Sequence, residues 1–335
     1  MKQQLLFLLF LLAMATGSVY SAERIVISAP GPRNISYLPI DLISKIGADK
    51  AEGVQLQVIH TGGGAVALNN LTSRNADFAV AGMPAVMSLR ANGGDVVAVA
   101  AVNDAPLFVL MVRSDLKGQV TTIADLKGKV IGVNTSTRHS KTTSQQLAEL
   151  LLKSGGVSLD SVRIVPAGQS WVEQSSLILS GTADAVMGDE PFASRLLNDG
   201  KVFFLANLAE PATLKSIKGA HFLHASLVTR SDIIDTEPHK VEKMVRMLSK
   251  TLGWIRDHSA EEIVDRLDIS DPNERSSLLA TLAKYHRIYT SDGRFSTSQL
   301  KETELFFHTT SAGDPGAESL RIEQMVNDLW AGRTQ

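Results

Sequence analysis

The stretch "TADAVMGDEP" at residues 182–191 decides the fold, because the chain carries a close variant of it, "NADFAVAGMP", at residues 75–84. In both copies an Ala-Asp pair is followed by an apolar run and then by a turn that contains proline. The two prolines, Pro84 and Pro191, follow their Ala-Asp pairs at the same distance. A phrase repeated in this way suggests two units of similar structure within one chain.

The elements around the two copies also recur in the same order. Short apolar runs predict strands of a first unit at 24–28, 54–60, 77–82 and 95–102, with helices at 38–46 and 65–74. The same patterns predict strands of a second unit at 129–133, 162–168 and 184–189, with helices at 142–153 and 175–180. Generic α/β units share Val, Ala and Gly by chance, but several elements in register favour a true repeat. We therefore expect an α/β fold of two lobes, each with a mostly parallel sheet flanked by helices.

Two long apolar strands, 106–113 and 221–230, leave the first and second units respectively. We expect them to act as crossovers and to form a hinge on which the lobes open and close. The first lobe is then predicted at 23–112 plus 222–335, and the second at 113–221. Helical patterns in the tail are predicted to pack on the first lobe, and they lie at 240–258, 259–267, 278–288, 299–307 and 320–329.

The N-terminus has the composition of a secretory signal peptide, predicted at residues 1–22. Lys2 precedes an apolar run at 5–15 and a stretch of small residues, although a buried N-terminal helix is the alternative. The sequence has 0 cysteines, which excludes disulfides, a cysteine nucleophile, thiolate metal ligands and a lipoprotein anchor. A net charge of −2 gives no sign of nucleic-acid binding. We expect an exported, periplasmic protein without a lipid anchor, and a monomer.

Ligands of open parallel sheets bind at the carboxyl ends of the strands, so the loops at these ends supply the candidate binding residues. In the first lobe the candidates are Asn34, Tyr37, Gly62, Gly63, Met83 and Asn103. In the second lobe they are Thr135, Ser136, Thr137, Arg138, Gln169, Trp171 and Glu190.

Two of these loops suit an anion. The glycines of "HTGGGA" at residues 60–65 would let backbone amides approach an anion at a helix start, or they form a plain tight turn. In "NTSTRHSKTT" at 134–143, hydroxyl groups lie beside Arg138 at a predicted helix start, which suits sulfonate, phosphonate or carboxylate oxygens. Helix capping, with Arg138 in solvent, is the alternative reading.

Three further candidates differ in chemistry. Trp171 and Tyr37 could cover a ligand with an aromatic face or simply pack against the protein. Glu190, whose turn is fixed by Pro191, could face the cleft and favour an ammonium or ring N–H donor. It could also oppose Arg138 and only balance charge.

Motifs of catalysis and metal binding are absent from the sequence. The 8 histidines form no His-x-x-x-His or His-Glu-x-x-His pair, and no Gly-x-Ser-x-Gly elbow occurs. We expect no metal and no cofactor, and we do not expect an enzyme.

Three stretches resemble the periplasmic substrate-binding proteins of ABC importers, in the NMT1/THI5-like and SsuA/TauA-like branch that binds nitrate, sulfonates, taurine and thiamine pyrimidines. They are "TTIADLKGKVIGV" at 121–133, "LSGTADAVMGDEPF" at 179–192 and "TLGWIRDHSAEEIVDRL" at 251–267. The resemblance covers about residues 24–267 and implies the two-lobed type II fold of periplasmic binding proteins. It also implies a small-molecule solute and, as partners, an ABC permease and ATPase.

The resemblance leaves the solute open. A sulfonate-type anion is the favoured expectation, and a pyrimidine or other amine-bearing nitrogen compound is the alternative, because of Glu190. Relatives that are enzymes, a sulfinate-cleaving hydrolase and a pyrimidine synthase, imply a catalytic cysteine that this chain lacks. A sensor lobe for a membrane kinase or chemoreceptor is the alternative of another class.

Overall fold

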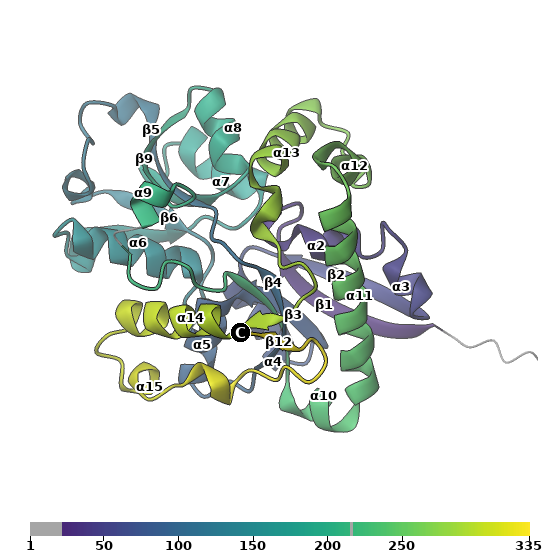
Figure 1. The fold of residues 1–335 in the computed structure, drawn as a ribbon. Helices are drawn as coiled ribbons and strands as arrows, with labels where there is room; N and C mark the ends of the chain where they lie inside the picture. The colour runs from purple at the N-terminus through teal and green to yellow at the C-terminus, as the bar shows by residue number, and fades with distance from the viewer. Residues whose placement is uncertain (1–21, 215–216) are drawn as a thin grey trace, which may run out of the picture.

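The computed structural model describes residues 22–214 and 217–335 (Figure 1). The predicted signal peptide at 1–22 therefore lies almost wholly outside the described residues. Among the described residues, no helix combines the length and apolar character that crossing a membrane requires.

Two separate five-stranded sheets form the cores of two lobes, and their strands follow equivalent orders (Figure 1). The first sheet consists of β2 (Val54–Thr61), β1 (Glu23–Pro30), β3 (Phe78–Gly82), β10 (Ala225–Thr229) and β4 (Val97–Asn103). The second sheet consists of β7 (Arg163–Pro166), β6 (Val130–Val133), β8 (Ala185–Asp189), β5 (Phe108–Arg113) and β9 (Val202–Asn207). Only β10 in the first sheet and β5 in the second run antiparallel to their neighbours. The predicted two-lobed fold with mostly parallel sheets is confirmed.

The repeated Ala-Asp phrase has the same structural task in both lobes. The Asp77 carboxylate accepts a hydrogen bond of 2.8 Å from Val26 N, and the Asp77 N–H donates to Val26 O. In the second lobe the Asp184 carboxylate accepts one of 2.9 Å from Val130 N, and the Asp184 N–H donates to Val130 O. Each aspartate thus ties the strand that follows it to the neighbouring parallel strand.

One of the two crossovers differs from the prediction in where its strand lies. β5 was placed in the first lobe, at 23–112, but it pairs with β8 and β9 in the second sheet. Its side chains are buried on both faces, with Phe108 and Leu110 in one apolar cluster and Val109 and Met111 in another. A strand that is apolar on both faces needs a central position in a sheet, and β5 finds that position only after the chain has crossed.

Helices cover both faces of each sheet. The first lobe carries α2 (Leu38–Leu42), α3 (Ala48–Ala51), α4 (Gly64–Thr72), α5 (Met83–Ala91), α10 (Ser231–Thr236) and α11 (Pro238–Asp257). The second lobe carries α6 (Thr143–Ser154), α7 (Trp171–Leu179), α8 (Phe192–Asn198) and α9 (Pro211–Leu214). Short 3₁₀ turns are η1 (Ile35–Tyr37), η2 (Ser114–Leu116), η3 (Ile123–Leu126), η4 (Leu159–Ser161), η5 (His286–Ile288) and η6 (Ile322–Gln324). α5, which contains the proline of the first repeat, and α8, which follows the proline of the second, were not predicted.

The tail elements are α12 (Ala260–Asp265), α13 (Pro272–Tyr285), α14 (Thr297–Thr310), α15 (Pro315–Glu318), β11 (Phe295–Ser296) and β12 (Arg333–Thr334). They were predicted to pack on the first lobe, but α13 contacts α8 and α14 contacts α6, both in the second lobe. Figure 1 shows α14 between α5 and α6. The tail therefore joins the lobes. The helix predicted at 320–329 is only the short turn η6, followed by a bridge from Val326 to Ala98.

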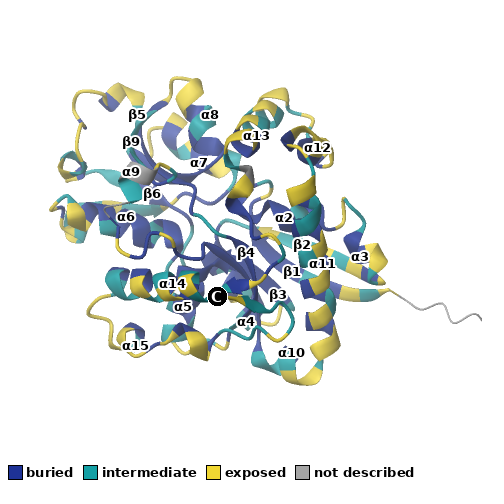
Figure 2. Cartoon of the chain, in the orientation of Figure 1, coloured by how far each residue is buried: buried dark blue, intermediate teal, exposed yellow. Residues whose placement is uncertain are grey.

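The long helix α11 confirms its predicted apolar stripe. Val241, Met244, Leu248, Leu252 and Ile255 are buried against the core of the first lobe. Figure 2 shows that α11 is buried on the side that faces the sheet and exposed on the other. The core of each lobe is thus closed on its own, and polar groups at the strand ends remain for the junction of the lobes.

Candidate functional site

Polar side chains from both lobes meet in a buried cluster where the central strands of the two sheets end. We call it the junction cluster, and it consists of Asn34, Tyr37, Asn134, Thr143, Gln169, Gln174, Asp189 and His224. All of these side chains are buried. The first lobe supplies Asn34 and Tyr37 from the turn after β1, and His224 lies directly before β10. The remainder come from the second lobe.

Asp189, the last residue of β8, lies at the centre of the cluster. Its carboxylate accepts hydrogen bonds from Gln169 Nε2 at 2.9 Å and from Gln174 Nε2 at 2.7 Å. Burial raises the pKa of the Asp189 carboxyl from 3.8 to about 6, while neighbouring amides, including those of Asn34 and Asn134, oppose this rise. The shift shows that these bonds do not fully replace the water that the ionised carboxylate has lost.

Several polar atoms of the cluster have no hydrogen-bond partner, although buried polar atoms usually do. They are Asn34 Nδ2, Asn134 Oδ1, Thr143 Oγ1, Gln169 Oε1 and both ring nitrogens of His224. Those of the described side chains that are buried without a partner all belong to this cluster. They come from both lobes, so the junction cluster offers unused hydrogen-bonding capacity between two halves of the protein.

The cluster is bordered by aromatic rings. Tyr37 lies 6.0 Å from His224 between ring centroids, and Phe108 meets the imidazole edge-on at 5.2 Å. Burial lowers the pKa of His224 to about 3, so its imidazole is neutral and offers one donor and one acceptor. Burial and the nearby Asp189 raise the pKa of Tyr37, which therefore keeps its proton.

Glycines allow the lobes to approach each other beside the cluster. A Cβ on Gly82, at the end of β3, would lie 2.2 Å from Thr143 Oγ1 of the second lobe. A Cβ on Gly63 would lie 2.7 Å from Thr135 O, and Thr135 N donates to Gly62 O at 3.1 Å. Gly62 and Gly63 were predicted to bind an anion, but here they form the contact surface between the lobes, with Thr135 as their partner.

The loop at 135–138 differs most from the prediction. Ser136 Oγ bonds to Gln145 Oε1 at 2.6 Å, and Thr137 Oγ1 accepts from Ser140 N at 3.1 Å, so both hydroxyls close their own loop. The helix begins only at α6, capped by Thr142, and not at the loop. Arg138 is exposed and lines a surface hollow together with Lys141 and Lys153. The predicted anion site is therefore a surface feature that lies outside the junction cluster.

Three more candidates pack within one lobe. Trp171 begins α7 and stacks under the guanidinium of Arg195, whose central carbon lies 3.9 Å from the ring centroid. Met83 is buried, and its sulfur accepts from Ser226 Oγ at 3.2 Å. Asn103 Oδ1 accepts from Ala105 N at 2.8 Å, which shapes the turn after β4. These contacts hold each of the three side chains within its own lobe.

Of the two adjacent carboxylates, Asp189 belongs to the cluster and Glu190 does not. The Glu190 oxygens accept from Ser194 N at 3.1 Å and from Ser194 Oγ at 2.8 Å, at the start of α8. Glu190 was predicted to face the cleft, but its carboxylate is used by this helix. Because neighbouring residues of a strand point to opposite faces, the pattern "GDEP" could not tell which acid faces inward.

Sequence reasoning also missed Thr143, Gln174 and His224. The cap "SWVE" at 170–173 is a sequence signal for the start of α7, because the Ser170 and Glu173 side chains bond each other's backbone N–H groups. Glu173 also accepts from Gln169 N at 3.1 Å and so holds Gln169 at the cluster. His224 lies before β10 with no local pattern to mark it.

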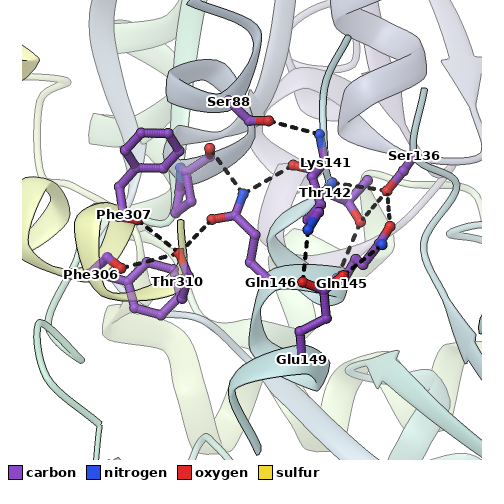
Figure 3. A network of polar contacts seen from close by, with 11 residues as sticks. Ser88, Ser136, Lys141, Thr142, Gln145, Gln146, Glu149, Phe306, Phe307 and Thr310 are labelled. Atoms are coloured by element: carbon purple, nitrogen blue, oxygen red, sulfur yellow. Dashed lines mark hydrogen bonds and ion pairs between the residues drawn. The ribbon is translucent and has the colours of Figure 1, made fainter. Parts of the chain in front are cut away.

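A second polar network ties the lobes together outside the cluster (Figure 3). Gln146 Nε2 on α6 donates to Pro84 O of the first lobe at 3.1 Å, and Gln146 Oε1 accepts from Thr310 Oγ1 of α14 at 3.0 Å. Beside it, Lys141 N donates to Ser88 Oγ at 3.0 Å. One buried side chain thus links both lobes and the tail.

Comparison with known proteins gives one family. The family described as "NMT1/THI5 like" matches residues 50–262. Among curated proteins, none matches the sequence of this chain.

Several solved structures share the fold. A protein from Bordetella bronchiseptica RB50 is 20% identical, with a TM-score of 0.81 over 92% of this chain and 95% of its own. The alkanesulfonate-binding protein SsuA from Xanthomonas axonopodis pv. citri, bound to MOPS, is 18% identical, with a TM-score of 0.70 over 93% of this chain and 98% of its own. The desulfurization enzyme DSZB is 17% identical, with a TM-score of 0.62 over 92% of this chain and 97% of its own. At these identities the likeness concerns the fold.

Proposed function

The chain belongs to the NMT1/THI5-like family, and from this premise we propose that it captures a small polar solute between its two lobes for an ABC importer. The permease and ATPase of the importer would receive the closed, loaded form. We propose that the protein acts as a periplasmic monomer, exported by the leader predicted at 1–22. Its role is binding without turnover, since it lacks the cysteine that the enzymes of this fold imply.

The observation that carries the proposal is the set of unpartnered polar atoms in the junction cluster. They belong to side chains of both lobes, and all are buried when the lobes are together. A solute that satisfies atoms on both sides stabilises the closed arrangement over the open one, which is what a two-lobed binding protein requires. Donors and acceptors that are already in place need little rearrangement to bind it.

The two candidate solutes make opposite demands on this cluster. The sulfonate-type anion favoured by the sequence needs donors or a cation, and Arg138 was to supply them. The amine-bearing alternative needs a carboxylate, which Asp189 supplies at the centre of the cluster. The buried carboxylate of the cluster therefore supports an amine-bearing solute, whereas the name of the alkanesulfonate-binding relative supports a sulfonate.

A thermal-shift screen of the purified mature protein tests solute capture. Small polar solutes of both charges are added singly, and a ligand bound only by the folded state raises the melting temperature by mass action. At about 100 times the dissociation constant the stabilisation is about 2.7 kcal/mol. We expect at least one solute to give a saturable rise. A flat response to every solute, or formation of product from the solute that binds, would contradict the proposal.

A further inference from the structure

We propose that the solute carries a protonated amine or amidinium, whose N–H groups pair with the Asp189 carboxylate in the junction cluster. This inference rests on the proposed function, because it names the class of solute for the same site. It follows from the charge of the cluster, from its unused donors and acceptors, and from the position of the nearest basic side chains.

The charge of the cluster is a single carboxylate without a cation. Asp189 is 1% exposed, and its hydrogen bonds come from neutral amides of Gln169 and Gln174. Among the described residues, no lysine or arginine pairs with Asp189, and His224 is neutral. Buried charges in proteins are normally paired, so a cation brought by the solute would complete the arrangement.

The unused capacity of the cluster consists mainly of acceptors. Gln169 donates through Nε2 to Asp189, which fixes its amide and leaves Oε1 as a free acceptor. Asn134 Oδ1 is a second acceptor, and Thr143 and neutral His224 can each accept or donate. Asn34 accepts from Ser36 N through Oδ1, so Nδ2 is a fixed donor. The Asn34 amide lies beside the Asp189 carboxylate, whose pKa it lowers, so the acceptors of this set are left for a solute rich in N–H groups.

A sulfonate or nitrate fits the same set poorly. Its oxygens can only accept hydrogen bonds, and they would lie beside the acceptors Gln169 Oε1 and Asn134 Oδ1 and the Asp189 carboxylate. Like charges in a buried site raise each other's energy strongly. The basic side chains of the nearby loop, Arg138 and Lys141, line the surface hollow and do not reach the cluster through any contact in the described residues.

Charge-matched probes test the inference on the mature full chain. Butylamine, agmatine and acetamidine are titrated at neutral pH by calorimetry, with butanesulfonate and nitrate as anions of similar size. The variant is Asp189→Asn, and the control is Glu190→Gln, which removes the same charge one residue further along but from the helix start of α8.

We expect one or more of the cationic probes to bind and the anions not to bind. Removing one partner of a buried charge pair costs about 2–5 kcal/mol, so Asp189→Asn should weaken binding at least about 30-fold. Glu190→Gln should stay within about 3-fold of the parent protein, since the Glu190 carboxylate bonds Ser194 rather than any cluster residue and glutamine is nearly isosteric with it. If Asp189→Asn does not fold, Asn134→Leu removes a second acceptor and should weaken the same probe.

Two outcomes would overturn the inference, and they have different consequences for the proposed function. Binding of butanesulfonate or nitrate without any amine, or equal affinity in Asp189→Asn, would refute the amine class and leave solute capture intact. No binding of any probe of either charge would count against solute capture itself, and the amine class would fall with it.

Discussion

The two copies of the repeated phrase share a scaffold but differ at one residue that matters. Asp77 and Asp184 make the same pair of hydrogen bonds to the neighbouring strand, at nearly equal lengths. At the end of the strand that follows, the first lobe has Gly82 and the second has Asp189, at matching positions of the repeat. One copy therefore ends in bare backbone and the other in a buried carboxylate.

The difference shows how a repeated fold can build an asymmetric site. Gly82 leaves room for Thr143 and lets α6 come close to the end of β3. Asp189 places a charge opposite it, among amides that cannot fully compensate it. The scaffold residues are alike because both sheets need the same bonds, whereas the residues at the junction have complementary tasks.

The largest expected effect concerns the charge of Asp189. Because burial raises the pKa to about 6 from 3.8, the ionised group disfavours the closed form by roughly 3 kcal/mol at neutral pH. The protonated carboxyl carries no such cost, so closure is favoured below about pH 4 and becomes less favourable as the pH rises from about 4 to about 6. Small-angle scattering of the solute-free proteins should therefore show a radius of gyration that rises more over this window in the parent protein than in Asp189→Asn.

Asp189→Asn is the control for that window. Asp104 is also partly buried, and its pKa is raised to about 6, so it titrates over the same range. Tyr37 keeps its proton throughout, because its pKa lies far above this range. His224 is neutral in the closed form and regains its ordinary pKa of 6.5 where opening exposes it, so its protonation favours opening as the pH falls, in the parent protein and the variant alike. The variant should stay compact at neutral pH. A parent protein and a variant with the same scattering at each pH would contradict the assignment.

Gly82→Ala should have the next largest effect on solute binding. Its Cβ would lie 2.2 Å from Thr143 Oγ1 and 3.2 Å from Thr143 Cβ, so either the Thr143 side chain turns away or the lobes separate slightly. Overpacking of this kind costs about 2 kcal/mol, so solute affinity should fall roughly 30-fold. The melting temperature without solute should change much less, because the clash disappears when the lobes part.

A double-mutant cycle sharpens this test. Thr143→Ala removes the clashing oxygen, so Gly82→Ala should cost less in that background than in the parent protein. Additive losses would mean that the methyl group acts within the first lobe, and the comparison of the two strand ends would then fail.

The likeness of the two halves predicts a smaller, paired effect. Asp77→Ala and Asp184→Ala each remove a charge-assisted bond to a strand N–H, at Val26 and Val130. Each should lower the free energy of unfolding by about 1.5 kcal/mol, the lower end for bonds to charged groups, because both residues are partly exposed. Urea unfolding measures both. A loss in one variant and none in the other would break the structural equivalence of the repeats.

The smallest expected effect is that of Gln146 on lobe closure. Gln146→Leu loses the bonds to Pro84 O, Thr310 Oγ1 and Lys141 O but keeps a side chain of similar size (Figure 3). A loss of about 1 kcal/mol would weaken solute binding about 5-fold. Thr310→Val is the matched variant, since it removes the bond from Gln146 to the tail, together with the contacts of the Thr310 hydroxyl to Phe306 O and Phe307 O within α14, and leaves the bond to Pro84 O. Unchanged affinity in both would show that this network does not contribute to closure.

Much of the fold could be predicted from the sequence because both copies of the repeat show local hydrophobic patterns. Apolar runs marked nine of the ten strands of the two sheets directly or as crossovers within a few residues, among them β1, β3 and β8. β9 was missed, and the membership of β5 was wrong, because pairing between distant strands leaves no local pattern. The tail was only partly predicted, since the contacts of α14 with the second lobe depend on the complete fold.

The site was harder to predict for a physical reason. Asn34, Tyr37 and Gln169 lie at strand ends as expected and belong to the cluster. Arg138 and Glu190 had suitable chemistry in the sequence but face solvent or a helix start in the structure. Whether such a side chain faces the cluster depends on the path of its loop. That path is set by contacts between the lobes, which residue type alone does not reveal.

A crystal structure of the protein with its tightest-binding cationic probe is the most direct test of the account. We expect the probe nitrogen within hydrogen-bonding distance of the Asp189 carboxylate, with a further contact to Asn34 or His224 of the first lobe. A probe bound instead in the surface hollow beside Arg138, with Asp189 still held only by Gln169 and Gln174, would contradict it.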